Sequence, residues 1–361
     1  YIQHGETNYP PSPGVPELRK AVVEFYRRWL GLEYDTSNVI VTSGGRPVIY
    51  GAYMTVVNEG ERVVYPVPSW NNNHYARIVG ASAVEVPCDA STDFLPTAAM
   101  LRDAVRGATL LALNSPSNPT GTLFSEQALV EICDLVLEEN ARRGPNNRPL
   151  YVLYDQIYWM LTFGGARHFN PVSLRPEMKQ YTIFVDGISK AFAATGLRVG
   201  WAVGPADVMA SMSDLLTHAG AWAPRAEQRA SADLLGADDD IRAFHATMLH
   251  EVQERLSLLA DGLNALRAEG FPVETTAPRA AIYLSARFAL HGKRTPDGEG
   301  LHDNESIRQY LLRSAGLAAV PFQAFGSRDE TGWFRLSAGA VSPQAIRELM
   351  PRLREALQAL R

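Results

Sequence analysis

The sequence has no long apolar run, only two cysteines, and no cluster of basic residues. No stretch approaches the length of about 20 apolar residues that a bilayer-spanning helix requires. The first twenty residues contain Glu6 and Glu17 but lack the apolar segment of a signal peptide. We therefore expect neither membrane insertion nor secretion. The net charge of −5 and the absence of a Lys/Arg stripe make nucleic acids and anionic membranes poor partners, and small metabolites better ones.

The two cysteines, Cys88 and Cys133, are not spaced like metal ligands or a redox pair. Such sparse cysteine usage fits a reducing compartment, and we expect a cytoplasmic protein.

The 361 residues are 46% hydrophobic, enough for one large domain and a smaller one. Between Val39 and Gly204, short β-branched runs alternate with helical patterns, which predicts an α/β fold with a mostly parallel sheet flanked by helices. The expected strands are Val39 to Thr42, Arg62 to Tyr65, Ala83 to Val86, Thr109 to Asn114, Leu150 to Tyr154, Thr182 to Asp186 and Gly200 to Gly204. Helices are expected from Pro47 to Val57 and from Ser125 to Glu139.

After about Ala237 the pattern changes to that of a smaller α+β domain. We expect a long helix from Ile241 to Glu269, a strand around Ile282 to Leu284, a loop from His291 to Asn304 and a last helix from Pro343. The predicted domains are residues 14–236 and 237–361, and residues 1–13 form a separate N-terminal segment.

Ligands of an open parallel sheet bind at the carboxyl ends of its strands, where this sequence places its chemically distinctive residues. They are Ser43-Gly44-Gly45-Arg46 after the first strand, Asn114 to Gly121 after the fourth, Tyr154 to Tyr158 after the fifth, and Ser189-Lys190 with Gly196 to Gly200 after the sixth. Glycines in such turns let backbone N–H groups approach an anion at a helix start. Each segment alone is weak support for a site.

Together, and in this order, the segments resemble the class I and II aminotransferases of fold type I, in particular the aspartate aminotransferase-like members. The motifs are Asn-x-Pro-x-Asn-Pro-Thr-Gly, Asp-x-x-Tyr and Ser-Lys-x5-Gly-x-Arg-x-Gly, and the resemblance runs from about Tyr9 to Arg335. It implies a pyridoxal 5′-phosphate (PLP) cofactor, amino-acid and 2-oxo-acid substrates, ping-pong kinetics, and a homodimer with shared active sites.

The resemblance also implies roles for individual residues. Lys190 matches the lysine that bonds covalently to PLP, and Asp155 the carboxylate that keeps the pyridine nitrogen protonated. Asn118 and Tyr158 match the partners of the ring oxygen, and Asn118 also borders the substrate. Trp70 falls where an aromatic ring stacks on the cofactor, although a core tryptophan is the alternative.

Other matches concern the two anionic ends of the ligands. Arg198, Ser189 and the backbone of Gly45 and Arg46 correspond to the phosphate site. Tyr9 resembles the tyrosine that reaches the phosphate of the neighbouring subunit, which would place the N-terminal segment near the dimer interface. Arg335, in Trp333-Phe334-Arg335-Leu336-Ser337, resembles the arginine that grips the substrate α-carboxylate.

Arg46 is the candidate for the residue that sets substrate choice. In a subgroup of bacterial aspartate aminotransferases a lysine at the matching position reads the distal carboxylate of the substrate, and an arginine could do so with a two-pronged grip. This favours aspartate or glutamate as donor. The alternative is that Arg46 only adds charge near the phosphate or lies in solvent.

Three other functions stay open from the sequence. One is a lyase, decarboxylase or cyclase on the same fold, the second an aminotransferase for aromatic or neutral amino acids, and the third a non-catalytic regulatory module. The intact Lys190, Asp155 and Arg335 argue against the third. Family members usually carry several tens of residues before the Tyr9 region, and the chain opens on Tyr1, so we expect an N-terminal segment to be missing.

Overall fold

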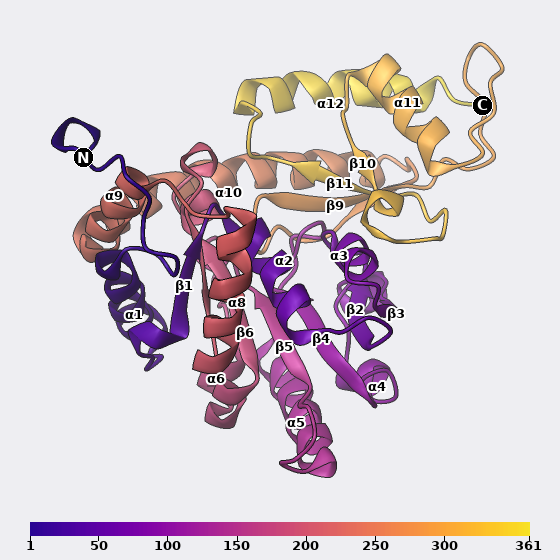
Figure 1. Cartoon of the computed structure of the whole chain (residues 1–361). Helices are drawn as coiled ribbons and strands as arrows, with labels where there is room; N and C mark the ends of the chain where they lie inside the picture. The colour runs from indigo at the N-terminus through magenta and orange to yellow at the C-terminus, as the bar shows by residue number, and fades with distance from the viewer.

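The computed structural model describes residues 1–361, which form two bodies joined by one long helix (Figure 1). The larger body is built on a seven-stranded sheet in the order β1-β7-β6-β5-β4-β2-β3. Its strands are β1 (Val39–Thr42), β2 (Arg62–Val67), β3 (Ser82–Pro87), β4 (Ala108–Asn114), β5 (Tyr151–Asp155), β6 (Thr182–Gly187) and β7 (Gly200–Val203). Only the pairings of β7 are antiparallel. The predicted mostly parallel α/β sheet is confirmed, with strand ends shifted by at most two residues.

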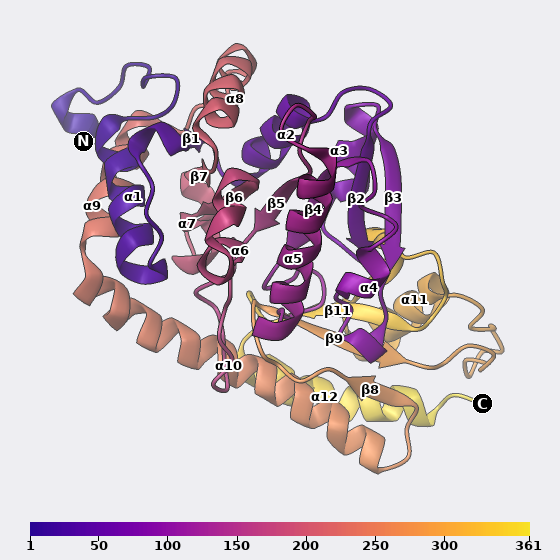
Figure 2. The ribbon, with the colours of Figure 1, turned by 90° about the horizontal axis from the view of Figure 1, so that it is seen from below.

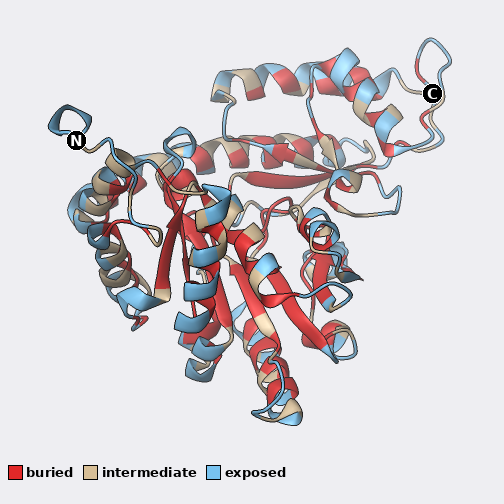
Figure 3. Ribbon diagram, viewed as in Figure 1, coloured by how far each residue is buried: buried red, intermediate tan, exposed pale blue.

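Helices cover both faces of this sheet, so its strands are apolar on both sides. In β4, Leu111 and Leu113 face one helical layer while Leu110 and Ala112 face the other. The first layer holds α1 (Pro16–Leu30), α4 (Ala98–Leu101), α5 (Glu126–Arg143), α6 (Pro171–Leu174) and α9 (Arg225–Gly236), and the second α2 (Gly45–Val56), α3 (Asn72–Ile78) and α8 (Ala206–Ala219). Figure 3 shows the strands buried between the two layers.

Helix ends differ from the sequence expectation where capping decides them. Helix α2 begins at Gly45, two residues before the predicted Pro47, because proline is tolerated in a first turn whose N–H groups have no helical partner. Helix α5 begins after Ser125, whose hydroxyl accepts the N–H of Ala128 at 3.2 Å. It continues four residues beyond the predicted Glu139, to Arg143.

The smaller body packs two helices and part of a third on an antiparallel sheet in the order β10-β11-β9-β8. Its elements are α10 (Asp238–Ala268), β8 (Val273–Thr275), β9 (Tyr283–Phe288), α11 (Asn304–Ala315), β10 (Val320–Pro321), β11 (Trp333–Ser337) and α12 (Pro343–Gln358). Helix α11 was not predicted, and Asn304, the last residue of the expected loop, is its first residue, capped by Asp303. Short segments complete the chain: α7 (Ile188–Ala191) and the 3-10 helices Ile2–His4, Thr36–Asn38, Ala90–Thr92, Pro176–Gln180, Thr195–Leu197 and Phe322–Phe325.

Helix α10 belongs to both bodies (Figure 2). Ile241 near its start lies in the core of the larger body, whereas Val252 and the apolar residues after it lie in the core of the smaller one. The domain boundary that we propose between residues 236 and 237 falls at the turn between α9 and α10. No helix combines the length and apolar character needed to cross a membrane.

The loop after β4 meets the start of β9 in close backbone contact. Gly121 has φ +71°, and a β-carbon there would overlap the carbonyl oxygen of Tyr283. Beside this contact, the hydroxyl of Ser285 donates to the carbonyl of Thr120 at 3.0 Å. These contacts dock the two bodies together next to the carboxyl edge of the large sheet.

We predict that Gly121→Ala destabilises the protein more than Gly292→Ala does. Both glycines have a positive φ, but a β-carbon at Gly292 would meet nothing within 4 Å. Each change costs about 1–2 kcal/mol for the left-handed backbone, and Gly121→Ala adds an overlap with a backbone atom of the other body. Thermal unfolding of the two variants measures the difference. Equal melting temperatures would show that the interface between the bodies tolerates the extra methyl group.

Candidate active site

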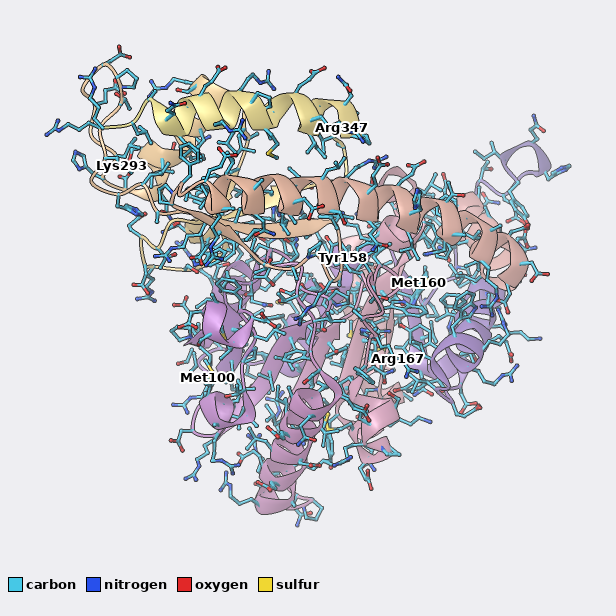
Figure 4. The ribbon with its side chains drawn as sticks, turned by 180° about the vertical axis from the view of Figure 1, so that it is seen from behind. Met100, Tyr158, Met160, Arg167, Lys293 and Arg347 are labelled. Atoms are coloured by element: carbon cyan, nitrogen blue, oxygen red, sulfur yellow. The ribbon has the colours of Figure 1, made fainter.

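A cavity of about 480 Å³ opens at the carboxyl edge of the large sheet, between the two bodies. Its lining comprises Gly45, Arg46, Ile49, Trp70, Asn118, Asp155, Ile157, Tyr158, Val185, Ser189, Lys190, Thr195, Arg198, Tyr283 and Arg335. Every site residue predicted from the sequence is in this set except Tyr9. The volume is typical of a small-molecule or cofactor site. Figure 4 places Tyr158 at the junction of the two bodies.

Lys190 projects from α7, which follows β6 without an intervening loop. Its amine lies 5.7 Å from the centroid of the Tyr158 ring. Burial and the nearby guanidinium of Arg335 lower the pKa of Lys190, and the carboxylate of Asp155 acts in the opposite direction. A lowered pKa increases the neutral fraction of the amine, which is the nucleophilic form.

Asp155 is the last residue of β5 and lies at the cavity wall. The N–H of Ile157 donates to its Oδ1 atom at 3.1 Å. Burial raises the pKa of Asp155 to about 6, against the opposing effects of this hydrogen bond and of Lys190. A carboxylate that is costly to ionise gains most from a cationic partner brought against it.

One end of the cavity collects donors suited to an anion. Helix α2 starts there at Gly45, so its first N–H groups have no helical partner. The Arg198 guanidinium is held in place as its Nη1 and Nη2 atoms donate to the carbonyls of Thr195 and Ser43 at 2.7 and 3.0 Å. A β-carbon at Gly44, where φ is +89°, would overlap this guanidinium. A helix start, a guanidinium and the lining residue Ser189 match the needs of a phosphate group.

Arg335 reaches the cavity from β11 of the smaller body. Its Nη1 atom donates to Oδ1 of Asn118 at 3.0 Å, and its buried Nε atom has no hydrogen-bond partner. The guanidinium lies over the rings of Tyr283 and Phe325, with centroids at 4.7 and 4.8 Å. A buried donor without a partner is costly, so this geometry is suited to a carboxylate that accepts from the guanidinium.

Two predicted residues lie at or beyond the rim of the cavity. The Arg46 guanidinium is 5.5 Å from the centroid of the Trp70 ring, is exposed, and makes no hydrogen bond or ion pair within the chain. Tyr9 lies outside the cavity, with 81% of its surface exposed and its ring edge-on to Trp222 at 5.3 Å.

Five lining residues were missed from the sequence: Ile49, Ile157, Val185, Thr195 and Tyr283. Two of them carried a usable signal. Ile49 follows Arg46 by three residues on α2, and Ile157 lies between Asp155 and Tyr158 in a segment singled out from the sequence. Tyr283 carried no such signal, because it comes from β9 of the smaller body, which is distant in sequence from the other site residues.

The fold and this site together define an α/β enzyme whose cavity combines a phosphate-type anion site, a carboxylate suited to a cationic group, and a lysine. The family model for aminotransferase class I and II matches residues 1–353, and the chain belongs to this family. Members use PLP, and the protein is a PLP-dependent aminotransferase.

Named relatives and a solved structure point to the same family. The aspartate aminotransferase of Rhizobium meliloti strain 1021 is 32% identical over 99% of this chain and 84% of its own. A probable aspartate/prephenate aminotransferase of Thermus aquaticus is 32% identical over 99% of this chain and 85% of its own. The crystal structure of the Rhizobium meliloti aspartate aminotransferase superposes with a TM-score of 0.90 at 30% identity, covering 100% of this chain and 86% of that one.

The residues present fit PLP. The end of the cavity with Gly45, Ser189 and Arg198 can bind the phosphate. The poorly solvated Asp155 carboxylate can pair with the protonated pyridine nitrogen, and the Lys190 amine can bond to the aldehyde.

Because burial raises the pKa of Asp155, the cofactor-free protein bears a cost for ionising it. The folded pKa of about 6 exceeds the ordinary aspartate value of 3.8, so the cost is fully present above about pH 6 and vanishes as the pH falls below 3.8. We predict that Asp155→Asn raises the free energy of unfolding of the cofactor-free protein at pH 8 by roughly 1–3 kcal/mol. Chemical denaturation between pH 4 and 8 measures this gain, which should shrink towards pH 4.

The exposed Asp297 is the matched control, and Asp297→Asn should change the stability by less than about 0.5 kcal/mol at every pH. A loss of stability in Asp155→Asn at pH 8 would contradict the prediction.

Proposed function

We propose that this aminotransferase moves the amino group of aspartate or glutamate to a 2-oxo acid by a ping-pong mechanism. One observation carries the choice of an acidic donor. Arg46 and Arg335 line the same cavity, and Arg46 has no partner of its own. A dicarboxylic amino acid has one carboxylate for each of these two guanidinium groups.

In this proposal Lys190 is the catalytic residue that binds PLP covalently and moves protons at the substrate α-carbon. PLP, when bound, withdraws electrons from that carbon and carries the amino group between the two half-reactions. The lowered pKa of Lys190 keeps a fraction of its amine neutral, and the neutral amine can accept the α-proton.

The residues around Lys190 hold the cofactor in this proposal. Asp155 balances the positive charge of the pyridine nitrogen. Asn118 and Tyr158 hydrogen-bond the phenolic oxygen of the ring, and Trp70 covers one face of it. The phosphate is bound by Ser189, Arg198 and the backbone N–H groups of Gly45 and Arg46.

The substrate is held at its two ends. Arg335 binds the α-carboxylate. Its Nη1 atom donates to Asn118, whereas its buried Nε atom has no partner in the chain and is available to the carboxylate. Arg46 binds the distal carboxylate at the rim of the cavity. Relatives that are named aspartate aminotransferases, and one named for aspartate and prephenate, support a donor with a second carboxylate.

A preference for aromatic or neutral donors is the second candidate. It is favoured by the position of Arg46 over Trp70, because an arginine that stays stacked on the ring leaves an aromatic wall for an apolar side chain. Donor selectivity separates the two candidates.

We further propose a cytoplasmic homodimer in which Tyr9 contacts the phosphate in the neighbouring subunit. Tyr9 is an exposed aromatic side chain outside the cavity of its own chain, as such a role requires. The two cysteines are buried and unpaired, which suits a reducing compartment.

We predict that borohydride reduction of the PLP-loaded protein places the pyridoxyl group on Lys190, because only this lysine lines the cavity. Peptide mass spectrometry locates the label. Lys190→Ala should abolish the labelling and the transamination while the protein still folds, and Lys20→Ala, at an exposed position, should change neither. A label on any other lysine would rule out the assignment.

We predict that Arg46→Ala lowers kcat/KM for aspartate roughly 10- to 150-fold. This corresponds to a loss of about 1.5–3 kcal/mol of transition-state stabilisation, the usual value of a hydrogen bond to a charged group. The values for alanine and phenylalanine should change little, because neither donor has a distal carboxylate. Single half-reactions with each donor, followed by absorbance, provide the comparison. Equal losses for acidic and neutral donors would assign Arg46 to the phosphate instead.

A further inference from the structure

Tyr283 is in contact with several parts of the site, although it has no assigned role. It is the first residue of β9 in the smaller body, and only 6% of its surface is exposed. Its hydroxyl lies 2.8 Å from the hydroxyl of Tyr158, and the two rings meet edge to face with centroids 5.6 Å apart. Its ring also packs under the Arg335 guanidinium.

The backbone around Tyr283 is fixed on both sides. Its carbonyl oxygen abuts Gly121 in the loop that carries Asn118. Two residues before it, the N–H of Ala281 donates to the carbonyl of Leu161 at 2.8 Å, in the segment that follows Tyr158. These backbone contacts fix the position of Tyr283 relative to Tyr158.

Which of the two hydroxyls donates the hydrogen bond follows from the number of protons. Each phenol has one proton to donate, and the two oxygens share a single hydrogen bond. If Tyr158 gave its proton to Tyr283, it could not donate to a ligand in the cavity. The assignment that leaves the Tyr158 proton free for a ligand is therefore the one in which Tyr283 donates.

We infer that Tyr283 is a positioning residue, which donates to the Tyr158 oxygen and thereby directs the Tyr158 proton to the phenolic oxygen of PLP. The inference rests on the role proposed above for Tyr158. A donor that itself accepts a hydrogen bond is polarised, and each added bond in such a chain strengthens the next by an estimated 10–30%. Tyr283 thus extends the hydrogen-bond network of the cofactor into the smaller body.

The experiment is a spectrophotometric pH titration of the PLP–Lys190 chromophore without substrate. A hydrogen bond to the phenolic oxygen stabilises its anionic form and lowers the pKa of the chromophore. Tyr283→Phe keeps the ring and its packing but removes the donor, so the pKa should rise by roughly 0.2–0.6 unit. Tyr158→Phe should raise it further, and the double variant should match Tyr158→Phe alone, because the Tyr283 hydroxyl acts only through Tyr158.

Tyr310→Phe is the matched control, since Tyr310 is a buried tyrosine of the smaller body whose hydroxyl donates to the Ala356 carbonyl instead. It should leave the chromophore unchanged. If Tyr158→Phe shifts the pKa and Tyr283→Phe does not, the inference is overturned while the role of Tyr158 stands. If Tyr158→Phe itself has no effect, the proposed role of Tyr158 fails and the inference with it. An additive double variant would also overturn the inference, since it would show that Tyr283 acts independently.

Discussion

The close backbone contact between Gly121 and Tyr283 determines how the two halves of the site meet. Asp155 ends a strand of the large sheet and Lys190 lies on α7 directly after another, whereas Arg335 and Tyr283 come from the small sheet. A hydrogen bond such as that from Arg335 to Asn118 is lost when its atoms move apart by a fraction of an ångström. This contact, together with the hydrogen bond from the Ala281 N–H to the Leu161 carbonyl, holds the substrate-binding half opposite the cofactor-binding half.

Three polar or charged groups in the cavity lack a full set of partners within the chain. Arg46 has no anionic partner, the Nε atom of Arg335 has no acceptor, and the half-buried Asp155 has no cation close enough to reverse the rise in its pKa. Such an arrangement lowers the stability of the empty protein and favours a ligand that has both an anionic and a cationic part. The family to which the chain belongs uses a cofactor of this kind.

Most of the larger body could be predicted from the sequence because its strands are buried on both faces and read as continuous apolar runs. The residues that follow these strands were also predictable, since strand ends of a parallel sheet converge at one edge. The first residues of α2 were misplaced because Pro47, the clearest helix-start signal, is preceded by two residues that already turn. Helix α11 was hidden by a polar, glycine-rich stretch before it.

The contribution of the smaller body to the site was harder to predict. Arg335 was found through a family motif, but Tyr283 lies in the short sequence Ala-Ile-Tyr-Leu, which has no feature that distinguishes a site residue from a core one. Its place depends on how two distant segments pack, and neither propensity nor periodicity contains that information.

The shared helix α10 has a consequence for how the molecule comes apart. Ile241 and Val252 are 11 positions apart on one helix, which corresponds to about 16 Å along its axis. Melting the smaller body would fray the helix from its C-terminal end and remove support from the apolar side chains at its other end. The two cores are thus coupled through one helix, so loss of packing in the smaller body also weakens the larger one.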